Sequence, residues 1–167
     1  QPFIGPSPVG PDVFDRTQLL PPSAPVEHNG ELWFYYTGIK HYAFVHSGSI
    51  KGYDDYTADA GAIHLAVLRR DGFVSLNAET DAGSVETKPF EAPAGSLRVN
   101  VDAPGGELVV EALDEEGKVL AKSMPIVGDK PNAAVKWREG SGSSLMGREI
   151  SLFFELRNAE LYSYWFE

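Results

Sequence analysis

The sequence predicts an all-β protein whose main part is an antiparallel β-sandwich of the jelly-roll type, preceded by a proline-rich arm. Two observations carry this prediction. Short apolar and aromatic stretches alternate with polar residues at period two, and no segment sustains the 3.6-residue apolar period of a helix. Glycine- and proline-containing turn signals also recur every ten or so residues, which is typical of antiparallel sandwiches and barrels.

The two ends of the chain differ in pattern. Residues 1–30 are rich in proline and have little alternation, which indicates an extended arm. Residues 150–156 and 161–166 alternate apolar and polar side chains, and we expect them to pair as a hairpin across residues 158–160. The hairpin is expected to complete a domain, whereas the start, which has no Met and no signal-like apolar stretch, is expected to lie within something larger or to follow processing.

The first half of the chain contains strands separated by a polar segment. Residues 31–38 follow the Asn29-Gly30 turn signal and are dense in aromatic side chains, so we predict a buried strand. Residues 39–60 lack periodicity, and such loops often hold functional residues. Residues 60–70 form the next predicted strand, which Asp71-Gly72 turns into a hairpin with residues 73–77.

Short strands continue to the end of the chain. We predict strands at 96–101, 107–113, 119–122 and 135–137, separated by turns at 104–106, 116–117, 128–129 and 140–142. The predicted organisation is residues 1–72 as arm and first strands and residues 73–167 as the sandwich.

The amino-acid composition limits the kinds of ligand and partner that the protein is expected to bind. The 24 acidic and 14 basic side chains give a net charge of -10, which argues against binding nucleic acid or an anionic membrane surface. Neutral and cationic ligands remain open. The chain has no Cys, which excludes disulfides, thiolate zinc sites and cysteine nucleophiles.

Several segments together resemble a known family. Those of the first half are Phe14-Asp15, LWFYYTG at 32–38, His41 and AVLRRDGFVSL at 66–76. Those of the second half are TKPF at 87–90, LRVNVDA at 97–103, VVEALD at 109–114 and VKW at 135–137. The first set resembles the last blade of a five-bladed β-propeller, and the second resembles the sandwich that follows such propellers in the furanosidase-like glycoside hydrolases of families 32 and 43.

The resemblance implies an exported, carbohydrate-active protein. In that family most catalytic carboxylates come from earlier blades, which this chain lacks, so the resemblance implies that the chain alone does not hydrolyse glycosides. The sandwich would support the propeller or bind sugar as an accessory domain. Two alternatives stay open: a stand-alone carbohydrate-binding sandwich without catalysis, and an assembly module that pairs with other copies by strand exchange.

Asp15 is the candidate catalytic residue. Glycoside hydrolysis uses two carboxyl groups, and the sequence shows no self-evident pair. The resemblance implies that Asp15 lies near the propeller axis. The alternative is that Asp15 only caps a turn next to Arg16.

Four residues of the polar segment and its border are the candidate sugar-binding residues: His41, Tyr42, Tyr53 and Tyr56. A neutral imidazole can hydrogen-bond a sugar hydroxyl, and exposed tyrosine rings can pack against the apolar face of a sugar. The alternative for His41 is an ordinary structural hydrogen bond. Two of the four aromatic residues at 33–36 are expected to face the core.

No metal or cofactor is predicted as essential. The spacing of the histidines matches no zinc motif. A structural calcium ion is considered at acidic turn residues, against the alternative that these turns are simply solvated. The residues concerned are Asp102, Asp114, Glu115, Glu116 and Asp129.

Overall fold

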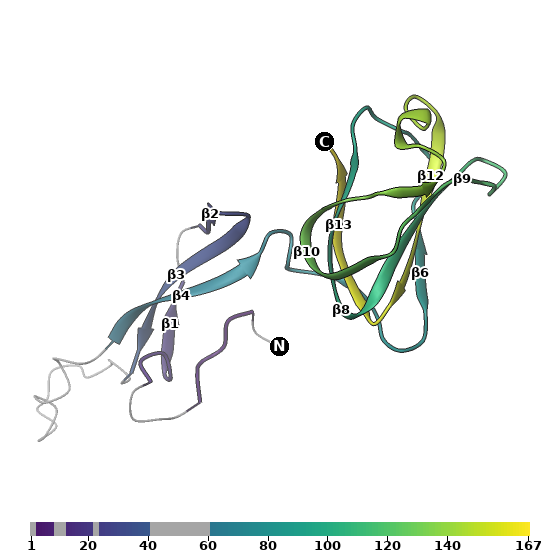
Figure 1. Cartoon of the computed structure of the whole chain (residues 1–167). Coiled ribbons are helices and arrows are strands. Elements are labelled where there is room, and N and C mark those ends of the chain that lie inside the picture. Colours follow the sequence, from purple (N-terminus) through teal and green to yellow (C-terminus); the bar gives the residue numbers. More distant parts are fainter. Residues whose placement is uncertain (1–2, 9–12, 22–23, 41–60) are drawn as a thin grey trace, which may run out of the picture. The chain divides into compact units, whose positions relative to one another are not determined.

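The chain forms antiparallel β-sheets in two compact units, Gln1–Arg70 and Asp71–Glu167 (Figure 1). The computed structural model describes residues 3–8, 13–21, 24–40 and 61–167. Every strand pair among these residues is antiparallel, which confirms the all-β antiparallel class. Nothing in the described ranges is an α-helix long and apolar enough to cross a membrane.

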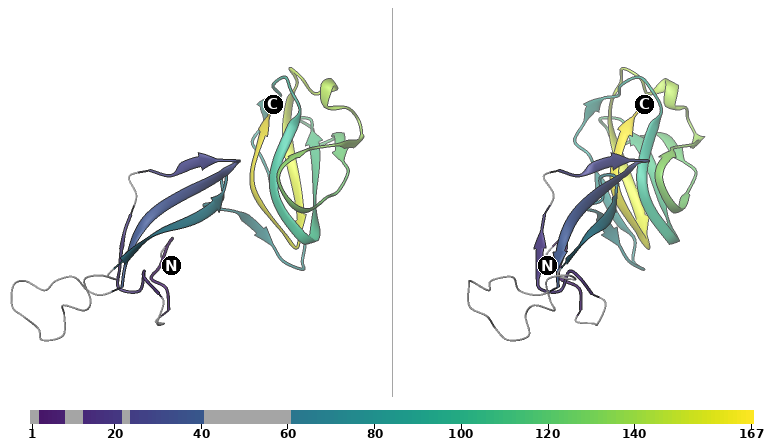
Figure 2. Two further views of the ribbon diagram at one scale, coloured as in Figure 1. Left: turned by 60° about the vertical axis from the view of Figure 1, so that its left-hand side comes forward. Right: turned by 90° about the vertical axis from the view of Figure 1, so that its left-hand side faces the viewer.

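The first unit is a four-stranded sheet built around β3, Glu31–Ile39. One edge of β3 pairs along its whole length with β4, Gly61–Arg69, and Figure 2 shows the two long strands side by side. The other edge pairs with β1, Gln18–Leu20, near one end and with β2, Val26–His28, near the other. Positive φ angles at Asn29 and Gly30 confirm the predicted turn between β2 and β3.

The two faces of this sheet differ in what covers them. On one face Phe34 and Tyr36 contact Phe3 and Asp15 of the N-terminal arm. The opposite face carries apolar side chains that are largely exposed, with Ile63 at 79% and Val67 at 50%. Cross-strand pairing places Trp33 opposite Val67 and Tyr35 opposite Leu65 on this face. We call it the open face.

The second unit is organised by β8, a 17-residue strand from Leu97 to Leu113. The first half of β8 pairs with β13, Ala159–Phe166, and the second half pairs with β12, Glu149–Arg157, and with β9, Val119–Ser123. β10, Ile126–Ala134, follows the other edge of the first half and reaches Leu108.

The remaining strands of the second unit are short. They are β5 (Leu76–Ala78), β6 (Gly83–Glu86), β7 (Phe90–Glu91) and β11 (Trp137–Glu139). They pair respectively with β13, β12, β12 and β9. One turn of 3-10 helix, η2 (Gly142–Ser144), lies in the segment predicted as a loop.

The core of the second unit is apolar and close to fully buried. Its largest buried side chains, all less than 2% exposed, are Phe154, Leu108, Ile150, Leu152, Val99, Val101 and Val110. They come from β8 and β12, whose alternating pattern in the sequence predicted one buried face on each strand.

The predicted hairpin of residues 60–70 with 73–77 is wrong. β4 pairs with β3, whereas Leu76–Ala78 pairs with β13. Two side-chain hydrogen bonds also connect this segment to the second unit: Ser75 donates to Glu160, and Ser163 donates to Asp71. The Asp71-Gly72 turn therefore leads the chain out of the first sheet instead of folding it back.

The predicted turn at 104–106 is also wrong, because β8 continues through it. Pairing with β13 ends at Asp102 and pairing with β12 begins at Glu107, so Pro104 lies where β8 changes partners and its missing N–H is tolerated. At Gly106 a side chain would overlap the carbonyl oxygen of Arg157. Proline and glycine here allow a change of partner without breaking the strand.

Two further predictions are corrected. Gly128-Asp129 is not a turn but part of β10, where Gly128 has a φ of 78° at a shift in register, a β-bulge. The predicted strand at 135–137 begins only at Trp137. The Glu116-Gly117 turn is confirmed, since Gly117 N–H donates to the Asp114 carbonyl.

The C-terminal strands exist as predicted, but their pairing as a hairpin is wrong. Asn158, with a φ of 42°, turns the chain between β12 and β13. The two strands then pair with different halves of β8. Because one long strand offers both halves as partners, consecutive strands need not pair with each other.

Candidate functional site

The candidate site of the first unit is built on the covered face of its sheet. Alternation along β3 places Tyr36 and Gly38 on this face, and register places His64 of β4 directly opposite Tyr36. Asp15 of the N-terminal arm lies against these residues and is only 5% exposed. The site therefore joins side chains from three separate parts of the sequence.

Gly38 makes room for this arrangement. A Cβ on Gly38 would come within 2.8 Å of both the Asp15 Cα and the His64 Nε2. Real side chains do not approach so closely, so any larger residue would displace Asp15, His64 or both. The glycine is required by close approach, since its φ is not in the left-handed region.

The arm is held to the sheet by hydrogen bonds from the two residues after Asp15 and by a cation–π contact at the residue before it. Thr17 donates from its N–H and its hydroxyl to the carbonyl of Ile39, at 3.1 and 2.6 Å. Arg16 Nε donates to the Lys40 carbonyl at 2.8 Å, and Lys40 Nζ lies 4.9 Å from the centre of the Phe14 ring. These contacts fix the backbone at Asp15, so the carboxylate is placed by a rigid element.

The carboxylate of Asp15 is held in its ionised form. Burial opposes ionisation, but hydrogen bonds from Ser7 and from the Tyr36 hydroxyl, together with the nearby His64, outweigh it and lower the pKa of Asp15. Tyr36 donates to Asp15 Oδ2 at 2.9 Å. Burial and this bond to a carboxylate raise the pKa of Tyr36. The pair is a buried anion with a phenol as its donor.

His64 completes the cluster. Its ring stacks on that of Tyr36, with centroids 5.1 Å apart and an interplanar angle of 18°. Its Nε2 is buried and has no hydrogen-bond partner among the described residues. A buried imidazole nitrogen without a partner is costly, so a water or ligand hydroxyl at this atom would be stabilised.

Asp15 is thus more than the turn cap considered as its alternative, because its side chain bonds across the sheet to Tyr36. No second carboxylate of the described residues contributes to its pKa. The cluster can accept a hydrogen bond or stabilise a positive charge, but it does not form the carboxyl pair of a glycosidase.

The other predicted site residues are His41, Tyr42, Tyr53 and Tyr56, and they lie outside the described residues. Of the aromatic residues at 33–36, Phe34 and Tyr36 contact the arm, whereas Tyr35 is 45% exposed on the open face. Tyr36, Gly38 and His64 were not predicted as site residues. The alternation of 31–38 and 60–70, combined with an antiparallel pairing of these strands, is the signal that could have found them.

The acidic residues considered for calcium do not form one group. Over the described ranges, no three His, Asp or Glu side chains are grouped as metal ligands. Asp114 Oδ1 instead accepts from the N–H groups of Glu116 and Lys118 in a turn. Asp102 lies far along β8 from this turn, opposite Asp129 of β10.

Neither a comparison with protein-family models nor searches of characterised proteins and of solved structures found a match to this chain.

Proposed function

We propose that the chain is part of an exported carbohydrate-active protein resembling the glycoside hydrolases of families 32 and 43. In this proposal the first unit is a propeller-blade-like sheet. The second unit is a jelly-roll-like β-sandwich that supports it or binds sugar as an accessory domain. Export and the sugar substrate rest on the sequence resemblance alone.

The observation that carries the proposal is the open face. It carries exposed apolar side chains at Ile63, Leu65 and Val67, whereas the other face of the sheet is covered by the arm. Exposed contiguous apolar patches mark interaction sites. In a propeller each blade packs by its faces against neighbouring sheets, so an open apolar face is expected on a blade taken by itself.

The size of the open face favours a neighbouring sheet as its partner over a second copy of the chain in a tight homodimer. Strands of this length span ~30 Å, and three strands abreast cover ~15 Å, which gives a face of roughly 450 Å². Stable complexes bury about 800 Å² per partner. The face alone would give only weak self-association, while further contacts with a neighbouring sheet would complete a stable interface.

The candidate site is compatible with this function but incomplete as a catalytic site. Asp15 offers an ionised carboxylate near a histidine, which suits binding of a sugar hydroxyl or stabilisation of positive charge. Hydrolysis requires a second carboxyl group, which in this proposal comes from neighbouring blades.

The test uses the full chain in sedimentation velocity over a range of concentrations. We expect reversible, concentration-dependent association or aggregation that is abolished by the double variant Ile63→Thr/Val67→Thr. Threonine keeps the β-branch that strands favour and removes apolar surface. Val119→Thr, at a residue exposed in the second unit, is the matched control and should leave association unchanged.

A wild-type chain that stays monomeric at every concentration would contradict the proposal. The assembly-module alternative makes a different prediction: a defined oligomer that dissociates when residues 1–30 are deleted. In the structure β1 and β2, which lie within these residues, pair with β3 of the same chain.

A further inference from the structure

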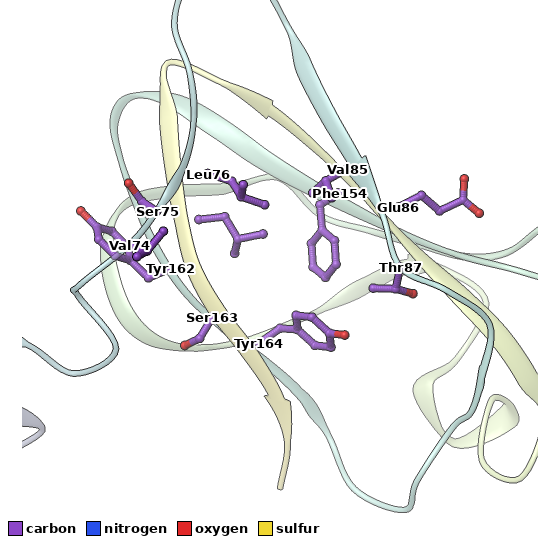
Figure 3. Close-up of a pocket in the computed structure, with 11 residues that line it drawn as sticks. Val74, Ser75, Leu76, Val85, Glu86, Thr87, Phe154, Tyr162, Ser163 and Tyr164 are labelled. Carbon is purple, nitrogen blue, oxygen red and sulfur yellow. The ribbon is translucent and has the colours of Figure 1, made fainter.

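The second unit carries a groove of about 380 Å³ that lies apart from the Asp15 cluster in sequence and in unit. β5 and β6 border it, and β12 and β13 contribute to its wall (Figure 3). Phe154, Leu161 and Val85 form apolar parts of the lining, and Phe154 is fully buried. The groove therefore has an apolar base formed by a rigid core.

Aromatic rings lie next to one another in this groove. The rings of Phe154 and Tyr164 have centroids 5.2 Å apart and are tilted by 40° (Figure 3). Tyr164 is 39% exposed, so part of its ring is available to a ligand. An exposed tyrosine supported by a buried phenylalanine is a stable platform for a flat apolar surface.

The rest of the lining is rich in hydroxyl groups. The hydroxyl-bearing residues are Ser75, Thr87, Tyr162, Ser163 and Tyr164. Among the lining residues the single charged side chain is that of Glu86, and none is basic. The Glu86 side chain points away from the groove (Figure 3), so the groove combines an apolar base with neutral hydroxyl groups.

Some of these polar groups are already engaged within the protein. Ser75 and Tyr162 donate to Glu160 Oε2 at 3.2 and 2.6 Å. Ser163 donates to Asp71 Oδ2 at 2.8 Å. These three hydroxyls stabilise the wall of the groove and are not the main candidates for ligand contacts.

Two other polar groups of the groove have capacity left. Thr87 Oγ1 accepts from the N–H of Leu152 at 3.0 Å, and its own proton can still be donated. The Tyr164 hydroxyl bonds to none of the described residues, and Figure 3 shows it directed towards Thr87.

We propose that this groove binds a ring of a neutral saccharide, with Tyr164 as the aromatic platform and the hydroxyls of Thr87 and Tyr164 as hydrogen-bonding partners. A sugar ring has one apolar face and hydroxyls at its edge, which matches an aromatic base beside hydroxyl groups. The volume lies near the lower limit of small-ligand pockets, about 300 to 1,000 Å³, and suits a single ring or a disaccharide end.

Charge and hydrogen bonding select this occupant. The chain charge of -10 and the lack of a basic side chain among the lining residues disfavour anionic ligands. A purely apolar ligand would cover the hydroxyls of Thr87 and Tyr164 without satisfying them, which costs binding free energy. Sugar hydroxyls can both donate to and accept from these two groups.

The inference takes its ligand class from the proposed function but concerns a separate site. The test is a titration of the full chain, labelled with ¹⁵N, with glucose, xylose, arabinose and fructose and with their short oligosaccharides. We expect saturable shifts of amide resonances around Thr87, Leu161 and Tyr164. The substitution Tyr164→Ala should weaken binding at least tenfold.

Val119→Ala is the control, because Val119 is also half-exposed on a strand of the second unit but does not line the groove. It should leave the titration unchanged, and circular dichroism should confirm that every variant keeps its sheet content. The absence of saturable shifts with any of these sugars would overturn the inference. Shifts at the groove with benzyl alcohol but with no sugar would also overturn it.

Failure of this inference is distinguishable from failure of the proposed function. If no sugar binds but the open-face variant still abolishes association, the groove proposal alone fails. If sugar binds at Tyr164 while the chain remains monomeric, the blade-like proposal fails and a stand-alone binding sandwich is supported.

Discussion

The two units differ in where their apolar side chains lie. In the second unit β8 and β12 enclose a core with Leu108, Val110 and Leu152 at 0% exposure. In the described part of the first unit the buried side chain is a charged one, Asp15, at 5% exposure, and the apolar side chains are partly or largely exposed. The second unit has a buried apolar core, whereas the described sheet of the first unit leaves apolar side chains of one face exposed.

The two units also differ in the interactions that stabilise their sheets. The second unit relies on apolar burial, which contributes about 25 cal/mol per Å². The arm of the first unit is held largely by polar contacts, such as Tyr36 with Asp15 and Thr17 with Ile39. We therefore expect the two units to respond differently to mutation and to pH.

The largest expected effect is on the second unit. Phe154→Ala removes a fully buried ring and should cost about 3 to 5 kcal/mol of the free energy of unfolding of that unit. Urea unfolding followed by hydrogen exchange of β8 and β12 peptides measures it. The matched change in the first unit, Phe34→Ala, should have a smaller effect because Phe34 is only partly buried. Equal losses would contradict the difference between the units.

The next effect is confined to the first unit. Gly38→Ala should destabilise the contact between arm and sheet by about 1 to 3 kcal/mol, because the new methyl group overlaps Asp15 and His64. Hydrogen exchange of β3 and β4 should rise while that of β8 stays the same. Gly105→Ala is the control, since no atom lies within 4 Å of a Cβ at that position.

The pH dependence of the first unit follows from Asp15 and Tyr36. The pKa of Asp15 is lowered below 3.8, so its contribution is present above pH 3.8 and is lost as the pH falls through the folded-state pKa. The pKa of Tyr36 is raised above 10.0, so its contribution is present below pH 10.0 and is lost as the pH rises through the folded-state value.

We therefore expect amide hydrogen exchange in the arm and β3 to accelerate at both low and high pH. In Asp15→Asn the acceleration at low pH should be reduced. Peptide-resolved exchange at matched intrinsic rates measures this response. If Asp15→Asn shows the same acceleration at low pH as the wild type, another group controls this pH dependence.

The smallest expected effect comes from a row of acidic residues in the second unit. Asp102 lies opposite Glu160 on one side and Asp129 on the other. Like charges directly opposite in antiparallel strands are destabilising, so Asp102→Asn should stabilise the second unit by about 0.2 to 1 kcal/mol at neutral pH. Thermal unfolding at low salt measures it, and the gain should shrink in high salt. A loss of stability would contradict the role assigned to repulsion.

The sequence predicted the all-β class and the location of several strands, because alternation and turn residues are local signals. Strands at 31–38, 60–70, 119–122 and 150–156 correspond to β3, β4, β9 and β12. The two strand pairings that the sequence predicted, 60–70 with 73–77 and 150–156 with 161–166, were wrong. The strands on either side of residues 158–160 do not pair with each other, because each pairs with a different half of β8. β8 lies about fifty residues earlier in the sequence, so no local pattern indicates this pairing.

The candidate site was predicted only in part for the same reason. Asp15 was identified from the sequence, but its partners Tyr36 and His64 depend on how the arm lies on the sheet. Their types are ordinary for strands, so neither carries a local signal of its own. The groove around Tyr164 likewise depends on strands β5, β6 and β13 meeting from distant parts of the chain.

Native-state amide hydrogen exchange of the full chain tests the central claim most directly, because it reports the stability of each unit separately. We predict that β8, β12 and β13 exchange only with global unfolding of the second unit, whereas β3 and β4 exchange by openings at least tenfold more frequent. Equal protection of the two sheets in the isolated monomer would contradict the account, since it would show that the first unit needs no partner over its open face.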